Sequence, residues 1–342
     1  MKSAAMFSTL RAMKSLARWV LGCALLASIV IAAPPARTLQ IAVIPKGTTH
    51  EFWKAVHTGA VKAQRELESK GYKVNVIWKG PLREDDRDQQ IQVVENFVNR
   101  RVDGIILAPL DSRALVAPVE LATQMKIPVV IFDSALKSDK MISYVATDNY
   151  KGGRLGAKRL AELMHDKGKA ILVRYQVGSA STEEREAGFL DEIAKHPSII
   201  LISTNQYAGA TRETAYQTSQ AVLTRLGKEV DGIFMPNETA TVGMMLALRD
   251  IKRAGGDVKL VGFDAGRQLI EGLKSGDVQG LVVQSPVKMG YTSVMTIVNH
   301  LEKKPVDKKV DTGVVMVTKE NMETPEIKEL LEPPIAKFLG RE

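Results

Sequence analysis

From Leu39 onward, short apolar runs alternate with amphipathic stretches that are long enough for helices. Runs such as Ile105-Ile106-Leu107-Ala108 and Val129-Val130-Ile131-Phe132 are continuously apolar rather than alternating apolar and polar. Strands of that kind are buried on both faces, which is typical of a parallel sheet covered by helical crossovers. We therefore expect an α/β fold built from doubly wound parallel sheets.

The same pattern gives the position of each expected element. The predicted helices include 50–69, 86–100, 113–124 and 151–165, and the segment from Asn321 onward is expected to form a helix and an irregular end. The predicted strands are 39–45, 72–78, 104–108, 129–133, 143–146, 169–173, 199–203, 232–235, 259–263, 280–283 and 312–317.

One strand motif occurs twice. Val102-Asp103-Gly104-Ile105 recurs as Val230-Asp231-Gly232-Ile233, each time after an amphipathic stretch and before a polar loop. A chance match of a common strand pattern is the alternative, but two copies of one α/β half is the more economical interpretation. A chain of 342 residues is also longer than a single hydrophobic core usually supports, so two domains are expected.

The N-terminus has the pattern of a secretion signal. Four bases precede the apolar run 19–31, which is too short to span a bilayer comfortably and is followed by Ala32-Ala33. We interpret 1–36 as a signal peptide cleaved among residues 32–37, which places the protein in the periplasm. The alternatives are a retained signal anchor and a lipidated Cys23, but the apolar run continues past Cys23. Because Cys23 is the only cysteine, the mature chain would contain no disulfide and no cysteine nucleophile.

Several chemistries find no support in the sequence. The formal charge of +8 is mild and interspersed, which disfavours a nucleic acid partner. No Walker loop is present and no G-x-G-x-x-G follows the first strand, which disfavours nucleotide cofactors. The five histidines are scattered, and no histidine stands at a suggestive spacing from Ser179, Ser181 or Thr182. We expect no cofactor, no metal and no catalytic residue, so the chain is not expected to be an enzyme.

Polar and aromatic side chains follow several predicted strands, where ligands bind in open α/β sheets. Carboxylates, amides and a guanidinium bind the hydroxyls of a sugar or polyol, and flat aromatic rings stack on its C–H faces. Each residue also has a structural interpretation: the aromatics as core residues, the aspartates as helix caps, and the arginine as an ion-pair partner of Glu183 or Glu184. The residues are Phe52, Trp53, Asp133, Arg185, Asn237, Asp264 and Gln284.

An ordered series of motifs extends this pattern along the chain. It includes Ile41-Ala42-Val43-Ile44, Ile127-Pro128-Val129-Val130 leading to Asp133, Ala146-Thr147-Asp148-Asn149, Ser181 to Phe189, and Val261-Gly262-Phe263-Asp264. With these motifs, the chain from Leu39 to about Val317 resembles a type I periplasmic binding protein of the ribose-binding kind.

The resemblance implies two α/β lobes joined by a three-segment hinge, with crossings near Asp148, Gln284 and Thr312. The N-terminal lobe would comprise 39–147 and 285–312, and the C-terminal lobe 148–284 and 313–342. It further implies a monomeric solute-binding protein that captures a sugar or polyol in the cleft between the lobes. Closure of the hinge would present the loaded protein to an ABC permease in the inner membrane.

Carried over residue by residue, the resemblance assigns the binding site. Phe52 and Trp53 would stack on the sugar, and Asp133, Arg185, Asn237, Asp264 and Gln284 would bind its hydroxyls. Thr49 or His50 stands where the family often has Asn, and Ser134 stands where sugar binders often have Arg. The aromatic residue that the family places after the seventh strand has no clear counterpart, although Tyr207 and Ala210 lie nearby.

Three other functions fit parts of this pattern. A periplasmic sensor subunit would present a small signalling ligand, such as a furanone-like molecule, to a membrane receptor, and the sequence does not separate it from a transport protein. A repressor of the lactose-repressor family would need a helix-turn-helix where residues 1–38 carry the secretion signal. An α/β enzyme would need a nucleophile or cofactor loop that the sequence does not offer.

Overall fold

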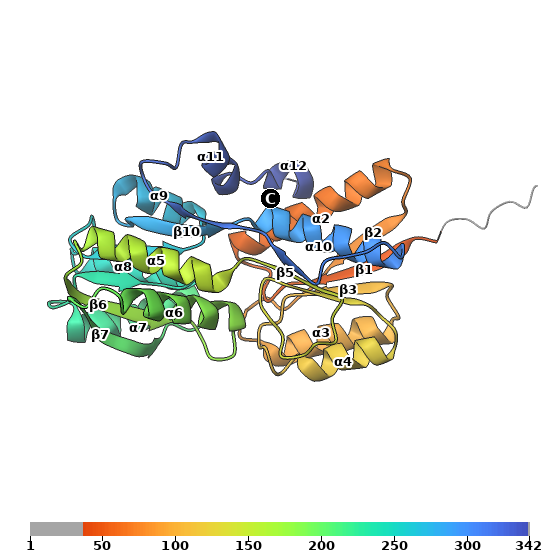
Figure 1. Cartoon of the computed structure of the whole chain (residues 1–342), viewed down its shortest axis with the longest axis horizontal. Coiled ribbons are helices and arrows are strands. Elements are labelled where there is room, and N and C mark those ends of the chain that lie inside the picture. The colour runs from red at the N-terminus through yellow and green to blue at the C-terminus, as the bar shows by residue number, and fades with distance from the viewer. Residues whose placement is uncertain (1–36, 341–342) are drawn as a thin grey trace, which may run out of the picture. The chain divides into compact units, whose positions relative to one another are not determined.

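Two six-stranded sheets form the framework of the computed structural model, which describes residues 37–340 (Figure 1). The first sheet has the order β11-β5-β4-β3-β1-β2, and every neighbouring pair is parallel. Its strands are β1 (Leu39–Ile44), β2 (Val74–Trp78), β3 (Gly104–Leu107), β4 (Val129–Phe132), β5 (Ser143–Ala146) and β11 (Lys309–Asp311).

The second sheet has the order β12-β10-β9-β8-β6-β7 and is parallel except for β12, which runs antiparallel to β10. Its strands are β6 (Gly168–Arg174), β7 (Ile199–Tyr207), β8 (Gly232–Phe234), β9 (Lys259–Phe263), β10 (Gly280–Gln284) and β12 (Val314–Val317). The α/β class with mostly parallel sheets is therefore confirmed.

Five strands of each sheet repeat one topology, as the duplicated strand motif predicts, and only the sixth strands, β11 and β12, differ in direction. β3 and β8 occupy equivalent positions, and the aspartate before each of them has the same structural role. Asp103 Oδ2 accepts a hydrogen bond of 2.7 Å from Gln40 N, and Asp231 Oδ2 accepts one of 2.7 Å from Lys169 N. Each aspartate thereby fixes the start of the neighbouring central strand.

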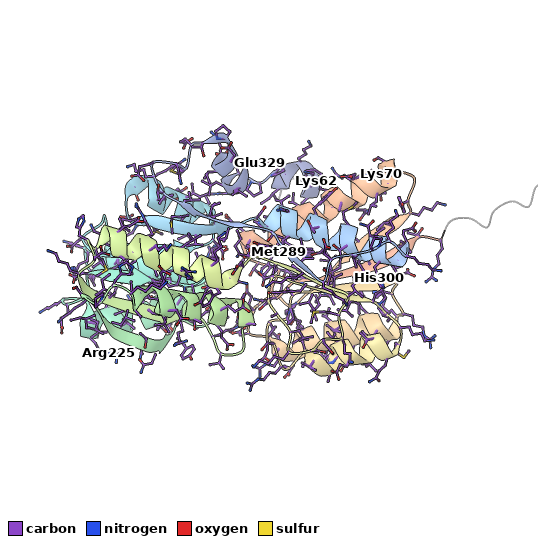
Figure 2. The ribbon with its side chains drawn as sticks, in the orientation of Figure 1. Lys62, Lys70, Arg225, Met289, His300 and Glu329 are labelled. Atoms are coloured by element: carbon purple, nitrogen blue, oxygen red, sulfur yellow. The ribbon has the colours of Figure 1, made fainter. Side chains whose placement is uncertain are left out.

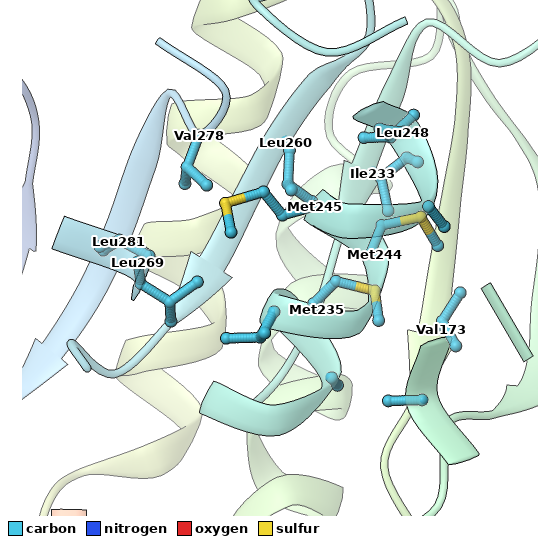
Figure 3. Close-up of a cluster of buried hydrophobic side chains, with 14 of the residues drawn as sticks. Val173, Ile233, Met235, Met244, Met245, Leu248, Leu260, Leu269, Val278 and Leu281 are labelled. Carbon is cyan, nitrogen blue, oxygen red and sulfur yellow. The ribbon is translucent and has the colours of Figure 1, made fainter. Parts of the chain in front are cut away.

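Helices cover both faces of each sheet. Over the first sheet, α2 and α10 pack on one face and α3 and α4 on the other; Met289 of α10, labelled in Figure 2, lies in this core. Over the second sheet, α5 and α6 cover one face, while α7, α8 and α9 bury the cluster that Figure 3 shows around Met244 and Met245. The helices are α2 (Glu51–Ser69), α3 (Arg87–Asn99), α4 (Val116–Gln124), α5 (Asn149–Leu163), α6 (Ala180–Ile193), α7 (Arg212–Leu226), α8 (Glu238–Asp250), α9 (Arg267–Ser275), α10 (Pro286–Leu301), α11 (Pro325–Leu331) and α12 (Ile335–Leu339).

The expected elements differ from the observed ones mainly near the last two strands. The sequence predicts one strand over 312–317, whereas the structure has β11 and β12 separated by Thr312 and Gly313, and the φ of Gly313 is 91°. β11 is an edge strand of three residues with two exposed side chains, so it has no apolar run to reveal it. β12 pairs antiparallel with β10, contrary to the all-parallel expectation.

The chain passes from the elements of one sheet to those of the other three times. The passages lie between β5 and α5, between β10 and α10, and between β11 and β12. Two of them are in contact, because Thr147 Oγ1 lies 3.4 Å from Thr312 Oγ1 and Asp148 N donates to Asp311 Oδ1 at 3.2 Å.

The predicted signal peptide, its retained-anchor alternative and Cys23 lie outside the described residues. Within 37–340, none of the helices combines the length and the apolar character that crossing a membrane would require.

Helices α5 and α6 approach so closely that glycine is required between them. A Cβ at Gly153 would lie 1.9 Å from the carbonyl oxygen of Arg185, and one at Gly188 would lie 2.0 Å from that of Tyr150. Gly153→Ala is expected to force the helices apart and to lower the free energy of unfolding by about 1–3 kcal/mol. Denaturant unfolding measures this, with Lys158→Ala on the exposed face of α5 as the control. An equal effect of both substitutions would contradict the close packing.

Candidate functional site

Side chains from both sheets line one cavity at the carboxyl ends of the central strands. The free space between their atoms, open solvent at its mouth included, is about 360 Å³, which lies within the range of small-molecule sites, roughly 300–1,000 Å³. The lining residues are Lys46, His50, Phe52, Trp53, Glu84, Asp133, Tyr175, Ser181, Thr182, Arg185, Asn237, Glu238, Asp264 and Gln284.

The cavity contains eight of the ten residues that the sequence assigned to a binding site, and Thr49 and Ser134 are the two that do not line it. Thr49 is exposed and its Oγ1 donates to Leu82 O at 3.3 Å. Ser134 is fully buried, and its Oγ accepts from Ser181 N at 3.0 Å. Both hydroxyls are therefore engaged with protein atoms, and neither residue lines the cavity.

The structure adds six lining residues that sequence reasoning missed: Lys46, Glu84, Tyr175, Ser181, Thr182 and Glu238. Lys46 and Tyr175 stand just after β1 and β6, so the strand-end rule could have found them. Tyr175 supplies an aromatic ring from the second sheet, whereas Tyr207 is 45% exposed and does not line the cavity. Glu84 lies in the loop between β2 and α3, where no strand end marks it.

Asp133 and Asp264 are equivalent residues of the two halves. Each directly follows a strand, has a left-handed φ (61° and 68°), and donates its backbone N–H to the neighbouring strand, at Val145 O and Val282 O. Aspartate tolerates this conformation better than most residues, but it is uncommon and often found at functional sites. Neither residue caps a helix, because α9 begins after Gly266, and no helix starts directly after Asp133. The geometry therefore favours the binding interpretation over the capping one.

Arg185 is held rigidly at the cavity wall. It is 3% exposed, donates from Nε to Asn149 Oδ1 at 2.8 Å and from Nη1 to Pro236 O at 2.9 Å, and stacks on Phe263 at 3.8 Å. Its guanidinium lies 3.8 Å from Asp264 Oδ2. These contacts replace the ion pair with Glu183 or Glu184 that a solvated arginine on α6 would make.

Asp264 lies between Arg185 and the end of β10. Gln284 Nε2 donates to Asp264 Oδ1 at 2.6 Å. Burial raises the pKa of Asp264, although Arg185 and the Gln284 hydrogen bond act in the opposite direction. Its carboxylate is therefore underpaired within the protein.

Lys46 supplies a cation beside Asp133, where Ser134 offers none. Its Nζ lies 2.8 Å from Asp133 Oδ2 and donates to Ser181 Oγ at 3.0 Å. Because Ser181 belongs to α6, Lys46 connects elements of the two sheets, as the Ser181–Ser134 hydrogen bond also does.

Glu84 accepts three hydrogen bonds from other side chains that line the cavity. Its carboxylate is 2.8 Å from His50 Nδ1, 2.7 Å from Trp53 Nε1 and 2.8 Å from Tyr175 OH. Burial alone would raise the pKa of Glu84, but the cations of His50 and Lys46 and these donors outweigh it and hold the pKa at about 2. Glu84 thus remains ionised and orients the aromatic groups around it.

The structure fits both sequence-based interpretations of Phe52 and Trp53, as residues that line a binding site and as residues of the core. Phe52 and Trp53 meet edge to face, with centroids 4.9 Å apart, and Trp53 also contacts Phe132 at 6.1 Å. Trp53 is 2% exposed and belongs to the core under α2, yet both rings line the cavity.

His50 is expected to make stability depend on pH. Burial lowers its pKa, but the charge and hydrogen bond of Glu84 outweigh burial and raise the pKa above 6.5. The protonated form therefore stabilises the fold below pH 6.5, and this contribution is lost as pH rises through the raised value. We expect the difference in free energy of unfolding between the wild type and His50→Gln to become smaller as the pH rises above 6.5 through the raised pKa of His50. Urea unfolding from pH 5.5 to 9 measures it, with exposed His300→Gln at the end of α10 as control (Figure 2); a difference independent of pH would contradict the assignment.

Two buried acceptor atoms of the cavity have no hydrogen-bond partner within residues 37–340: Glu238 Oε2 and Gln284 Oε1. Buried polar atoms are rarely left without partners, because desolvating them costs free energy. Their convergence on one cavity indicates a ligand that donates hydrogen bonds. Within the same residues, no group of three histidine, cysteine or acidic side chains is arranged to hold a metal ion.

Known proteins share this sequence and architecture. Residues 41–305 match the periplasmic binding protein domain family. A ribose import binding protein of Haemophilus influenzae is 26% identical over 86% of this chain and 97% of its own length. A carbohydrate transporter solute-binding protein of Agrobacterium radiobacter, solved with D-arabinose, is 32% identical with a TM-score of 0.81 over 87% of this chain and all of its own.

A solute-binding protein of an ABC transporter from Agrobacterium vitis, solved with D-fucose, is 36% identical with a TM-score of 0.80 over 86% of this chain and all of its own. The family match covers well over half of the sequence, and the relatives align with almost their full lengths. The chain therefore belongs to the periplasmic binding protein family, a family of non-enzymatic solute-binding proteins, and its relatives are carbohydrate-binding components of ABC transporters.

Proposed function

We propose that this protein captures a sugar or polyol in the cavity and delivers it to an ABC importer. The observation that carries the proposal is the convergence of two unpartnered acceptors, Glu238 Oε2 and Gln284 Oε1, with the rings of Phe52 and Trp53. A monosaccharide offers hydroxyl donors around its rim and apolar C–H faces for the rings. The sugars bound in the related structures, D-arabinose and D-fucose, support the same class of ligand.

The ligand would close a hinge between two lobes, 39–147 with 285–312 and 148–284 with 313–342. The three chain passages between the sheets support this division, as do the contacts of Ser181 with Lys46 and Ser134 across it. A ligand that contacts both lobes favours the closed form, because those contacts are complete only there.

The delivery partner would be an ABC permease of the inner membrane, approached from the periplasm by a monomer. The family membership and the secretion signal predicted over 1–36 support this placement.

A thermal-shift screen against pentoses, hexoses, polyols, inositols and purine nucleosides tests the proposed ligand class. At a concentration of about 100 times its dissociation constant, a ligand stabilises the fold by about 2.7 kcal/mol, which raises the melting temperature by several degrees. A response to one sugar or polyol would support the proposal. A response confined to nucleosides, or none across the panel, would contradict it.

A further inference from the structure

Glu238 is a lining residue that the resemblance to sugar binders does not assign. It begins α8, directly after the cap residue Asn237, and is 3% exposed. An acidic residue in the first turn of a helix has an ordinary explanation, since it favours the helix dipole. That explanation would leave its carboxylate near solvent, whereas here it faces the cavity.

The two oxygens of Glu238 have different surroundings. Oε1 accepts a hydrogen bond of 3.0 Å from Arg212 Nη2. It is also packed against the loop after β9, because a Cβ on Gly266 would lie 2.6 Å from it. Oε2 is buried and has no hydrogen-bond partner in the described part of the chain. The carboxylate is therefore fixed through one oxygen while the other remains available.

The neighbouring cations are already engaged and leave Oε2 unsatisfied. His50 pairs with Glu84, Lys46 with Asp133 and Ser181, and Arg185 with Asn149 and Pro236. Burial raises the pKa of Glu238, although the charges of His50 and Arg212 oppose it. One carboxylate oxygen of Glu238 is thus paired and the other is buried without a partner, which costs free energy in the ligand-free fold.

We propose that Glu238 Oε2 accepts a hydrogen bond from a ligand hydroxyl, and that Glu238 thereby selects neutral sugars and excludes sugar acids and sugar phosphates. The inference rests on the proposed function. A neutral sugar can donate to Oε2, whereas an anionic substituent near Glu238 brings only acceptors and negative charge. The other three acidic side chains of the cavity each lie beside a lining cation, Asp133 beside Lys46, Glu84 beside His50 and Asp264 beside Arg185. The discrimination against anions is therefore assigned to Glu238.

The selectivity test uses matched neutral and acidic probes: D-arabinose with D-arabinonate, D-galactose with D-galacturonate, and D-glucose with glucose 6-phosphate. Calorimetry should show binding of a neutral member at least tenfold tighter than of its acidic partner. In Glu238→Gln, affinity for that neutral sugar should fall at least tenfold and the preference over the acid should narrow. Equal affinity of the wild type for both members, or unchanged binding by Glu238→Gln, would overturn the proposal.

Glu192→Gln is the matched control. Its side chain is 6% exposed, against 4% for Glu238, but both Arg154 and Lys195 pair with it. It lies near the C-terminal end of α6 and does not line the cavity, which the N-terminal part of that helix reaches through Ser181 and Arg185. The hydrogen bonds from Lys195 and Arg154 hold the pKa of Glu192 at about 2. Sugar affinity should be unchanged in this variant.

A comparison without ligand separates this proposal from the proposed function. Glu238→Gln should raise the melting temperature at pH 7, because it removes an underpaired buried charge, while Glu192→Gln should lower it. If both variants are less stable than the wild type, Glu238 is a structural partner of Arg212 and the proposal fails. If no sugar or polyol of the thermal-shift panel binds the wild type, the proposed function fails, and the stability comparison still decides whether Glu238 is kept at a cost to folding.

Discussion

Replacing Asp264 by Asn is expected to lower the affinity for the bound sugar about 100-fold, a loss of about 2.7 kcal/mol. Hydrogen bonds to charged groups contribute about 1.5–3 kcal/mol each, and Asp264 is placed to accept at least one from the ligand. Asn keeps the size of the side chain, tolerates the left-handed backbone and can still accept from Gln284 Nε2. The fold should therefore be retained, and it should become slightly more stable because burial raises the pKa of Asp264.

Calorimetry with the sugar identified in the screen measures this loss. Asp277→Asn is the matched control, because Asp277 pairs with Arg249 and does not line the cavity. Affinity within threefold of the wild type in Asp264→Asn would remove Asp264 from the binding site, whatever the result for the control.

The sheets were predictable because their strands are buried on both faces. Segments such as Val129–Phe132 and Lys259–Phe263 are apolar enough to be recognised without knowledge of their neighbours. β11 was not, since its register is set by pairing with β5 and by Thr312 N bonding Ala146 O rather than by its own residues. An edge strand that is defined by its pairing partner has no apolar run in its own sequence from which it could be predicted.

The candidate site was predictable where strand ends determine it. Asp133, Asp264 and Gln284 stand at carboxyl ends of parallel strands, and the fold alone brings such positions together. Glu84 and Glu238 were not predicted, because neither a position in a loop nor one at a helix start indicates the direction of the side chain. Lys46 also follows β1, but it was not predicted because a lysine before a glycine is typical of an exposed turn.

Ser134 stands where sugar binders often have Arg, and the contacts around Asp133 explain this difference. Arg at this position would bring a fork of donors to Asp133, but Ser134 instead accepts from Ser181 N. Lys46 lies against Asp133 as a single cation. Asp133 is therefore paired with one ammonium in place of a guanidinium fork.

Arg185→Met is expected to abolish sugar binding and also to lower the free energy of unfolding by about 3–5 kcal/mol. The substitution keeps much of the apolar volume on Phe263 but leaves Pro236 O and Asn149 Oδ1 without their donor. It also leaves the buried Asp264 carboxylate without its nearby cation. Arg154→Met is the control: the Arg154 side chain is 41% exposed, and surface pairs of this kind contribute at most about 1 kcal/mol.

A double variant separates the two roles of Arg185. If the instability of Arg185→Met comes largely from the uncompensated charge of Asp264, adding Asp264→Asn should recover part of the lost stability, and the two effects should not be additive. Binding should stay absent, because neither the guanidinium nor the carboxylate is then available to the sugar. Denaturant unfolding of the four proteins gives the coupling free energy. Additive effects on stability would show that the hydrogen bonds to Pro236 and Asn149, rather than the charge pair, are what the fold loses with Arg185.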